Sequence, residues 1–227
     1  MKPELVVMLT YNDETVENAL DLFNEMKDTP VTYWGFKDVG LPPNRMKEVV
    51  DSMNASGKIT SLEVVSLTEK EGLAGAKLAV ECGFNILMGT AFFDSINNYL
   101  KDKPVKYYPF IGHVHGHPSI LDGSTEEIIQ HAHSMEAKGV DGIDILSYRY
   151  TGNAPALLEE VVKATNVPVV SAGSIDSYDR IAEVQNTGAW GFTIGTAFFD
   201  KKFIPNGSFS ENMMATWEWL QKHEKLD

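Results

Sequence analysis

Histidine and aspartate side chains accompany two apolar segments in the middle of the chain. His113 and His115 lie two residues apart at the end of segment 106–113, and Asp144 lies within segment 141–146. If these segments are neighbouring strands, the two-residue period of a strand places both imidazoles on one face. They could then move protons near neutral pH, with Asp144 orienting an imidazole or acting as the opposing acid. The same three side chains are candidates to hold a divalent metal ion or to be hydrogen-bonded structural groups.

Lys37 and Glu63 are charged residues in apolar, strand-like segments. Lys37 ends segment 31–37, where partial burial would lower its pKa and favour amine or imine chemistry. Glu63 lies within segment 60–66, and a buried carboxylate needs a partner. If both side chains point into one interior, they form an ion pair that serves either catalysis or structure. The alternative for Lys37 is a side chain that reaches solvent or anchors a substrate anion.

Glycine-containing loops follow the last two apolar segments. Gly173 and Ser174 follow the seventh segment, and Gly195 and Thr196 follow the eighth. A glycine lets the backbone approach an oxyanion closely, and a helix that starts after Thr196 would direct its free N–H groups toward it. We therefore expect these four residues to bind phosphate. Arg149 lies on the loop after the sixth segment and is either a contact for substrate oxygens or a solvated arginine.

Eight apolar, β-branched segments alternate with longer amphipathic ones, and this alternation predicts how the reactive residues are positioned. The predicted strands are 4–9, 31–37, 60–66, 84–88, 106–113, 141–146, 168–172 and 190–194. Asp13 and Ser124 precede acidic residues, as helix N-caps do, and segment 153–165 has one apolar face. Strands that alternate with helices pair in parallel, which predicts a single-domain (β/α)8 TIM barrel over residues 1–227. In such barrels the loops at the carboxyl ends of the strands build the active site.

The hexapeptide GTAFFD occurs twice, at residues 89–94 and 195–200, about half the chain apart. The two copies follow the predicted fourth and eighth strands. This spacing favours a duplication of one half-barrel, although convergence on a shared phosphate-loop geometry is the alternative.

Composition and charge exclude several classes of protein. The 227 residues are 43% hydrophobic and 22% charged, which is typical of a globular chain that buries a large core. The net charge of −13 disfavours binding to nucleic acid or to an anionic membrane. A single cysteine, Cys82, excludes an internal disulfide and a multi-cysteine zinc site. The apolar segment 5–9 is too short to span a bilayer, so we expect a cytoplasmic protein. The sequence leaves open whether it forms a homo-oligomer.

Segment 168–199 resembles the seventh strand, helix and eighth strand of the ribulose-phosphate-binding barrels, with Gly173 and Gly195 at the phosphate-loop positions. This superfamily includes histidine and tryptophan biosynthetic isomerases, thiamine phosphate synthase and N-acetylmannosamine-6-phosphate epimerase. The resemblance implies a small phosphorylated substrate. The histidine-pathway isomerases use aspartates after strands one and five, but residues 9–11 and 113–115 contain none. The acid that the epimerase carries near strand seven is also missing from residues 171–174.

The combined observations predict an enzyme that acts on a small phosphorylated metabolite. Proton abstraction next to a carbonyl would make it a sugar-phosphate isomerase or epimerase, and an imine at Lys37 would make it an aldolase-type lyase. No cofactor is required for this chemistry, while a divalent metal or FMN stays open because flavin-binding barrels share the phosphate loops. The alternative is a phosphate-ligand sensor similar to the glycerol-3-phosphate-responsive antiterminators, which would act on RNA.

Overall fold

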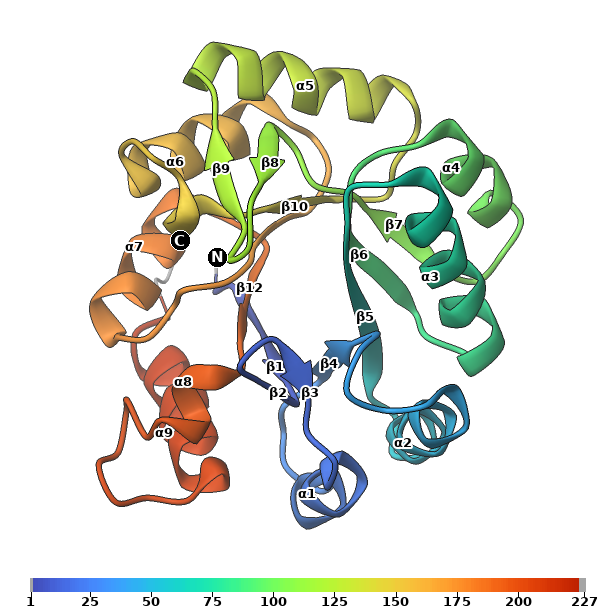
Figure 1. Ribbon diagram of the computed structural model, residues 1–227. Coiled ribbons are helices and arrows are strands. Elements are labelled where there is room, and N and C mark those ends of the chain that lie inside the picture. Colours follow the sequence, from blue (N-terminus) through green and yellow to red (C-terminus); the bar gives the residue numbers. More distant parts are fainter. Residues whose placement is uncertain (1, 225–227) are drawn as a thin grey trace.

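The computed structural model describes residues 2–224, which form a parallel β-barrel surrounded by helices (Figure 1). The barrel strands are β1 (Glu4–Met8), β4 (Tyr33–Lys37), β5 (Ile59–Ser66), β6 (Ile86–Thr90), β7 (Lys106–Tyr108), β10 (Ile143–Ile145), β11 (Val169–Ser171) and β12 (Gly191–Ile194). Consecutive strands pair in parallel, and β12 pairs with β1. A bridge between Phe110 and Asp144 joins the remaining edges next to β7 and β10. The predicted (β/α)8 fold is confirmed.

Helices cover the outside of the barrel, between consecutive strands (Figure 1). They are α1 (Ala19–Met26), α2 (Pro43–Ala55), α3 (Glu69–Cys82), α4 (Asp94–Leu100), α5 (Thr125–Ala137), α6 (Ala154–Ala164), α7 (Tyr178–Thr187), α8 (Thr196–Phe199) and α9 (Phe209–Lys222), with a 3-10 turn η1 (Ser147–Arg149) after β10. The predicted cap at Ser124 is confirmed: its hydroxyl accepts the Glu127 N–H, and Glu127 accepts the Ser124 N–H. Within residues 2–224, no helix is long and apolar enough to cross a bilayer.

Two small antiparallel hairpins rise from loops at the carboxyl ends of strands, and each corrects a prediction. The first pairs β2 (Thr10–Tyr11) with β3 (Glu14–Thr15), and Asp13 lies in its turn. The N-cap of α1 is Asn18, so the prediction of a cap at Asp13 is wrong. Asn12 and Asp13 have φ of 49° and 66°, the conformation of a two-residue hairpin turn, which competes with helix capping.

The second hairpin pairs β8 (His113–His115) with β9 (Ile120–Asp122). The predicted fifth strand, 106–113, therefore ends early, because β7 stops at Tyr108. Gly112 has a φ of 77°, a left-handed conformation that turns the chain away from the barrel direction. The two histidines consequently belong to a loop excursion rather than to a barrel strand.

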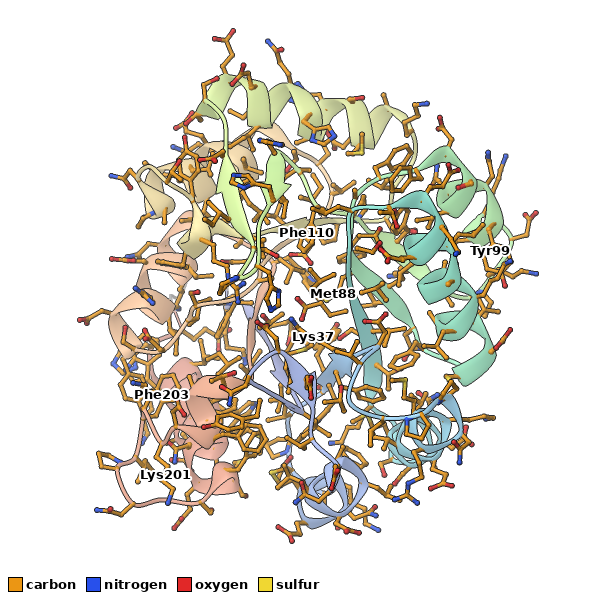
Figure 2. All side chains as sticks on the ribbon, in the orientation of Figure 1. Lys37, Met88, Tyr99, Phe110, Lys201 and Phe203 are labelled. Atoms are coloured by element: carbon orange, nitrogen blue, oxygen red, sulfur yellow. The ribbon has the colours of Figure 1, made fainter. Side chains whose placement is uncertain are left out.

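Strand register decides which polar side chains face the barrel interior. Met88 and Val170 belong to an apolar cluster whose members all lie on barrel strands or directly beside them, and none lies on a helix. Because these strands are on several sides of the barrel, the cluster fills the barrel interior. Lys37 is in register with Glu63, and Glu63 with Met88. Asp144 is in register with Val170. Because neighbours in register point to the same side of a sheet, all three polar side chains face inward. Figure 2 shows Lys37 and Met88 in the central region of the barrel.

The two GTAFFD copies follow equivalent barrel strands but have different local structures. Gly89 and Thr90 end β6, the next three residues are irregular, and α4 begins at Asp94. In the second copy Gly195 is the N-cap of α8. The φ of Gly89 is 86°, whereas that of Gly195 is −129°. The placement after the fourth and eighth strands agrees with a half-barrel duplication, which stays a prediction.

Candidate functional site

A cavity of about 420 Å³ opens at the carboxyl ends of the barrel strands, and we call it the mouth cavity. Residues of β1, β4, β5 and β12 line it, as do residues of the loops after β10, β11 and β12. Its lining includes Gly173, Ser174, Gly195, Thr196, Lys37, Glu63 and Arg149. The structure therefore brings the predicted phosphate residues to the same cavity as the predicted reactive pair.

Local geometry favours glycine at both glycine loops. Gly173 has a φ of 72° and Ser174 one of 58°, both left-handed, and the Gly173 N–H donates to Thr193 Oγ1 at 3.2 Å. A Cβ at Gly195 would lie 2.8 Å from the Thr10 carbonyl oxygen, so only glycine fits there. Helix α8 starts at the next residue, and its first N–H groups lack partners within the helix. Lys202 adds an ammonium group to the lining, which suits a phosphate.

Lys37 lies between two carboxylates at the bottom of the mouth cavity. Its Nζ is 2.8 Å from Asp13 Oδ1 and 3.8 Å from Glu63 Oε1. Burial lowers the pKa of Lys37, but the Glu63 and Asp13 carboxylates raise it by more, so the pKa is above its ordinary value. The prediction of a lowered pKa for Lys37 is wrong. The prediction considered the burial of Lys37 but not the Asp13 carboxylate, which is its second partner. Lys37 is an ammonium ion in this arrangement.

Asp13 is the partner that the sequence interpretation missed. The β2–β3 hairpin holds it over β4, where Thr15 Oγ1 accepts the Lys37 N–H at 3.0 Å and donates to the Lys37 carbonyl at 2.8 Å. Partial burial raises the pKa of Asp13, but the hydrogen bond and charge of Lys37 lower it further, so it stays ionised. The sequence signal was Asn12-Asp13 between two short β-prone pairs, a composition typical of a two-residue hairpin turn.

Asp144 is fully buried inside the barrel, and neither carboxylate oxygen has a hydrogen-bond partner among the described residues. Burial raises its pKa well above the ordinary value, and the charge of Glu63 adds to this, against the lowering effect of Lys37 and Arg149. Asp144 is absent from the lining of the mouth cavity. It is therefore buried away from the cavity surface, and the raised pKa favours its protonated form.

The structure separates His113 and His115 from the mouth cavity. Their rings lie 5.0 Å apart, on the same face of β8 as predicted, and His115 Nε2 is hydrogen-bonded to Asp122 Oδ2. His113 lines a different hollow of about 430 Å³, next to His131. The three metal candidates His113, His115 and Asp144 do not come together: in residues 2–224 no three such side chains are placed to hold a metal ion.

His117, from the loop between β8 and β9, is the histidine that reaches the site. It lines a hollow of about 180 Å³ beside the mouth cavity, which we call the side compartment. The two hollows share lining residues Asp13, Lys37, Glu63, Arg149 and Gly173, so they adjoin each other. The sequence signal was the spacing His113-x-His115-x-His117, which does not indicate which histidine turns inward.

Arg149 lies between the two hollows, at the end of η1. A Cβ built on Gly173 would lie 3.0 Å from Arg149 Nε, so the absence of a side chain at Gly173 is what admits the guanidinium. A planar guanidinium at this point can donate two parallel hydrogen bonds to a phosphate or carboxylate.

Comparisons with known proteins agree with the geometry. A structure described as native KDPGal superposes with a TM-score of 0.67 at 12% identity, covering 97% of this chain and 98% of that one. The N-acetylmannosamine-6-phosphate 2-epimerase of Clostridium perfringens superposes with a TM-score of 0.63 at 15% identity, covering 88% and 91%. This chain is a TIM barrel. At these identities the likeness shows the fold.

Sequence comparison adds a shorter match. A phosphoribosyl-imidazole-4-carboxamide isomerase of Methanococcoides burtonii is 36% identical over 52 residues, which span 23% of this chain and 21% of the isomerase. The match covers less than a quarter of either sequence, so it is a local likeness to that isomerase. No protein-family model matches the chain. The matches thus include one protein named as an epimerase and one named as an isomerase.

Proposed function

We propose that this TIM barrel is an enzyme that isomerises or epimerises a small phosphorylated metabolite by abstracting a proton next to a carbonyl group. One observation carries the proposal: the phosphate-loop residues and the Lys37–Glu63 pair line a single cavity. A phosphate held at Gly173, Ser174, Gly195 and Thr196 would fix one end of the substrate. Its carbonyl carbons would then lie within reach of the ion pair.

Lys37 and Glu63 divide the chemistry between them. The Glu63 carboxylate removes a proton from the carbon beside the carbonyl, and the electron pair of that C–H bond forms the double bond of an enediolate. The Lys37 ammonium stabilises the negative oxygen that results, and Arg149 binds another substrate oxygen. Return of the proton to the opposite face of the same carbon gives the epimer, and return to the neighbouring carbon gives the isomer.

His117 and Asp144 support the proton transfer in this proposal. His117 faces the same space as Lys37 and Glu63, and in its protonated form it can donate its own proton to the carbon while the proton taken by Glu63 passes to solvent. In this proposal the buried Asp144 carboxyl group is protonated, so it adds no second negative charge near Glu63. His113 and His115 line no part of either hollow, so the proposal gives them no catalytic step.

The lyase alternative requires a neutral amine at Lys37. The two carboxylates that raise the pKa of Lys37 hold the amine protonated, and a protonated amine does not attack a carbonyl. This favours proton abstraction over imine formation. In either case no metal or cofactor is needed for the first step.

Solvent-isotope exchange and borohydride trapping separate these reactions. Candidate aldose and ketose phosphates are incubated with the protein in deuterium oxide, and exchange at the carbon beside the carbonyl is followed by NMR. We expect exchange that Glu63→Gln abolishes, with no borohydride-dependent mass added to the protein. A covalent adduct at Lys37 would instead establish the lyase reaction. No exchange and no adduct with any candidate would contradict the proposal.

A further inference from the structure

Large apolar side chains are exposed around one side of the barrel mouth. Val39 and Val65 have 46% and 40% of their surface exposed, and each lies two residues beyond a member of the Lys37–Glu63 pair. The register of β5 against β6 shifts between Glu63 and Ser66, and Val65 lines the side compartment together with Glu63. Exposed apolar surface beside a polar cavity indicates a site that a ligand covers.

These two valines line the side compartment together with Phe110 and Leu146. Figure 2 shows Phe110 near the central opening of the barrel. The four apolar side chains lie on or after β4, β5, β7 and β10, which are four of five consecutive barrel strands; β6 contributes none. The phosphate loops follow β11 and β12, on the other side of Lys37. The mouth is therefore polar at one end and apolar at the other.

The size of the side compartment limits what can enter it. Its volume of about 180 Å³ is similar to that of an apolar cavity of about 150 Å³ that binds one benzene molecule. His117, Ser119 and Asp38 also line the compartment and can receive polar substituents of such a group. The rest of its wall is the part shared with the mouth cavity, which includes Lys37, Glu63 and Arg149.

We propose that the ligand is a phosphate monoester with a ring-sized, mainly apolar group, which occupies the side compartment while the phosphate occupies the mouth cavity. The proposal rests on the proposed function for the phosphate end, and it narrows the substrate class beyond a simple sugar phosphate. The reacting carbons lie between the two ends, beside Lys37 and Glu63. A sugar phosphate without an apolar group would leave Val39 and Val65 uncovered.

Binding of two phosphate esters to the intact protein tests the inference. Benzyl phosphate and methyl phosphate carry the same charged end and differ in the ring, and isothermal titration calorimetry gives both dissociation constants. We expect benzyl phosphate to bind at least about tenfold more tightly, because the ring buries apolar surface in the side compartment. Val65→Asp should bring the ratio close to one, since a carboxylate then lines the compartment.

Leu67→Asp is the matched control. Leu67 is 44% exposed, lies two residues after Val65 and is outside the compartment lining, so this variant should keep the wild-type ratio. Equal affinities of the wild type for both esters would overturn the inference and leave the phosphate site standing. An equal loss in Leu67→Asp and Val65→Asp would also overturn it. Binding of neither ester would remove the phosphate site, and the inference with it.

Discussion

Lys37 and Asp144 are two buried ionisable residues that the barrel treats in opposite ways. Lys37 has carboxylates on both sides, so its charged form is the stable one. Asp144 has no partner in the described part of the chain, so its neutral form is stable. An unpaired charge in the interior costs several kcal/mol, whereas a paired one is retained. The pKa is raised in both residues, and this favours the charged form of Lys37 and the neutral form of Asp144.

Replacing Lys37 by methionine should destabilise the fold and abolish isotope exchange. The substitution leaves Glu63 as a buried carboxylate without its cation, which typically costs about 3 kcal/mol of unfolding free energy. Lys47→Met is the control, because Lys47 pairs with Asp51 at 2.7 Å on the exposed face of α2 and such pairs contribute about 0.5 kcal/mol. Urea denaturation measures both variants. Similar losses in the two would show that the Lys37 pairing adds no stability.

Replacing Asp144 by asparagine should stabilise the protein at neutral pH. The pKa of Asp144 in the native state is raised well above 3.8, its ordinary value, which applies to the unfolded chain. At a pH between the unfolded and the native pKa, the native state therefore holds a proton that the unfolded state has lost. Stability contributed by this group is present at low pH and falls by about 1.4 kcal/mol per pH unit as the pH rises through that window. Asparagine does not titrate, so the Asp144→Asn variant should lack this loss of stability with rising pH.

Urea denaturation of Asp144→Asn at about pH 5 and about pH 8 measures the difference in slope. Asp102→Asn, at an exposed loop position, should follow the wild type. Parallel curves for Asp144→Asn and the wild type would mean that Asp144 is not a neutral buried acid.

The loops after β10, β11 and β12, with the two hairpins, are the elements that complete the mouth. Gly173→Ala tests the close approach of Arg149 to the loop after β11. Gly173 and Gly57 both have a φ of 72°. Alanine at either position should therefore lower the free energy of unfolding by a similar amount, about 1–2 kcal/mol, through backbone strain. A Cβ at Gly57 contacts nothing within 4 Å, whereas one at Gly173 displaces Arg149. Only Gly173→Ala should weaken methyl phosphate binding, and equal affinities in the two variants would contradict this.

The β8–β9 hairpin presents three histidines, of which one reaches the side compartment. His117→Ala should lower the rate of isotope exchange by about 100-fold, as loss of a general acid does. His115→Ala should keep the wild-type rate, because His115 pairs with Asp122 outside the site. Rates as a function of pH distinguish the two variants. A larger loss in His115→Ala than in His117→Ala would reverse the assignment.

The net charge of −13 disfavours the alternative that the protein is an RNA-binding sensor. The glycerol uptake operon antiterminator regulatory protein of Listeria monocytogenes shares the fold, with a TM-score of 0.59 at 12% identity, covering 86% of this chain and 93% of that one. A shared fold does not carry function. An acidic surface repels the phosphates of RNA, so the enzyme is favoured over the sensor.

Filter binding to RNA, with and without glycerol 3-phosphate, checks this expectation. We expect no retention of RNA by the protein at low salt in either condition, because no phosphate would be neutralised by the acidic surface. Retention that falls steeply with added salt and depends on glycerol 3-phosphate would favour the sensor.

Sequence patterns alone predicted the barrel, which the structure confirms, and the two glycine loops that line the mouth cavity. Alternating strand and helix segments, and glycines directly after the last two strands, are local patterns, and local patterns can be read without knowing distant contacts. Strand parity also placed Lys37 and Glu63 together, because adjacent parallel strands of a barrel share a register.

Only the tertiary structure decided which residues meet at the mouth. Asp13 reaches Lys37 because a two-residue turn folds the chain back over β4, and His117 replaces His113 and His115 because β7 ends before the hairpin. The isolation of Asp144 follows from packing on every side of the barrel interior. Each of these outcomes depends on where loops from distant parts of the chain lie in the folded protein. The number of residues between two loops does not give the distance between them in space.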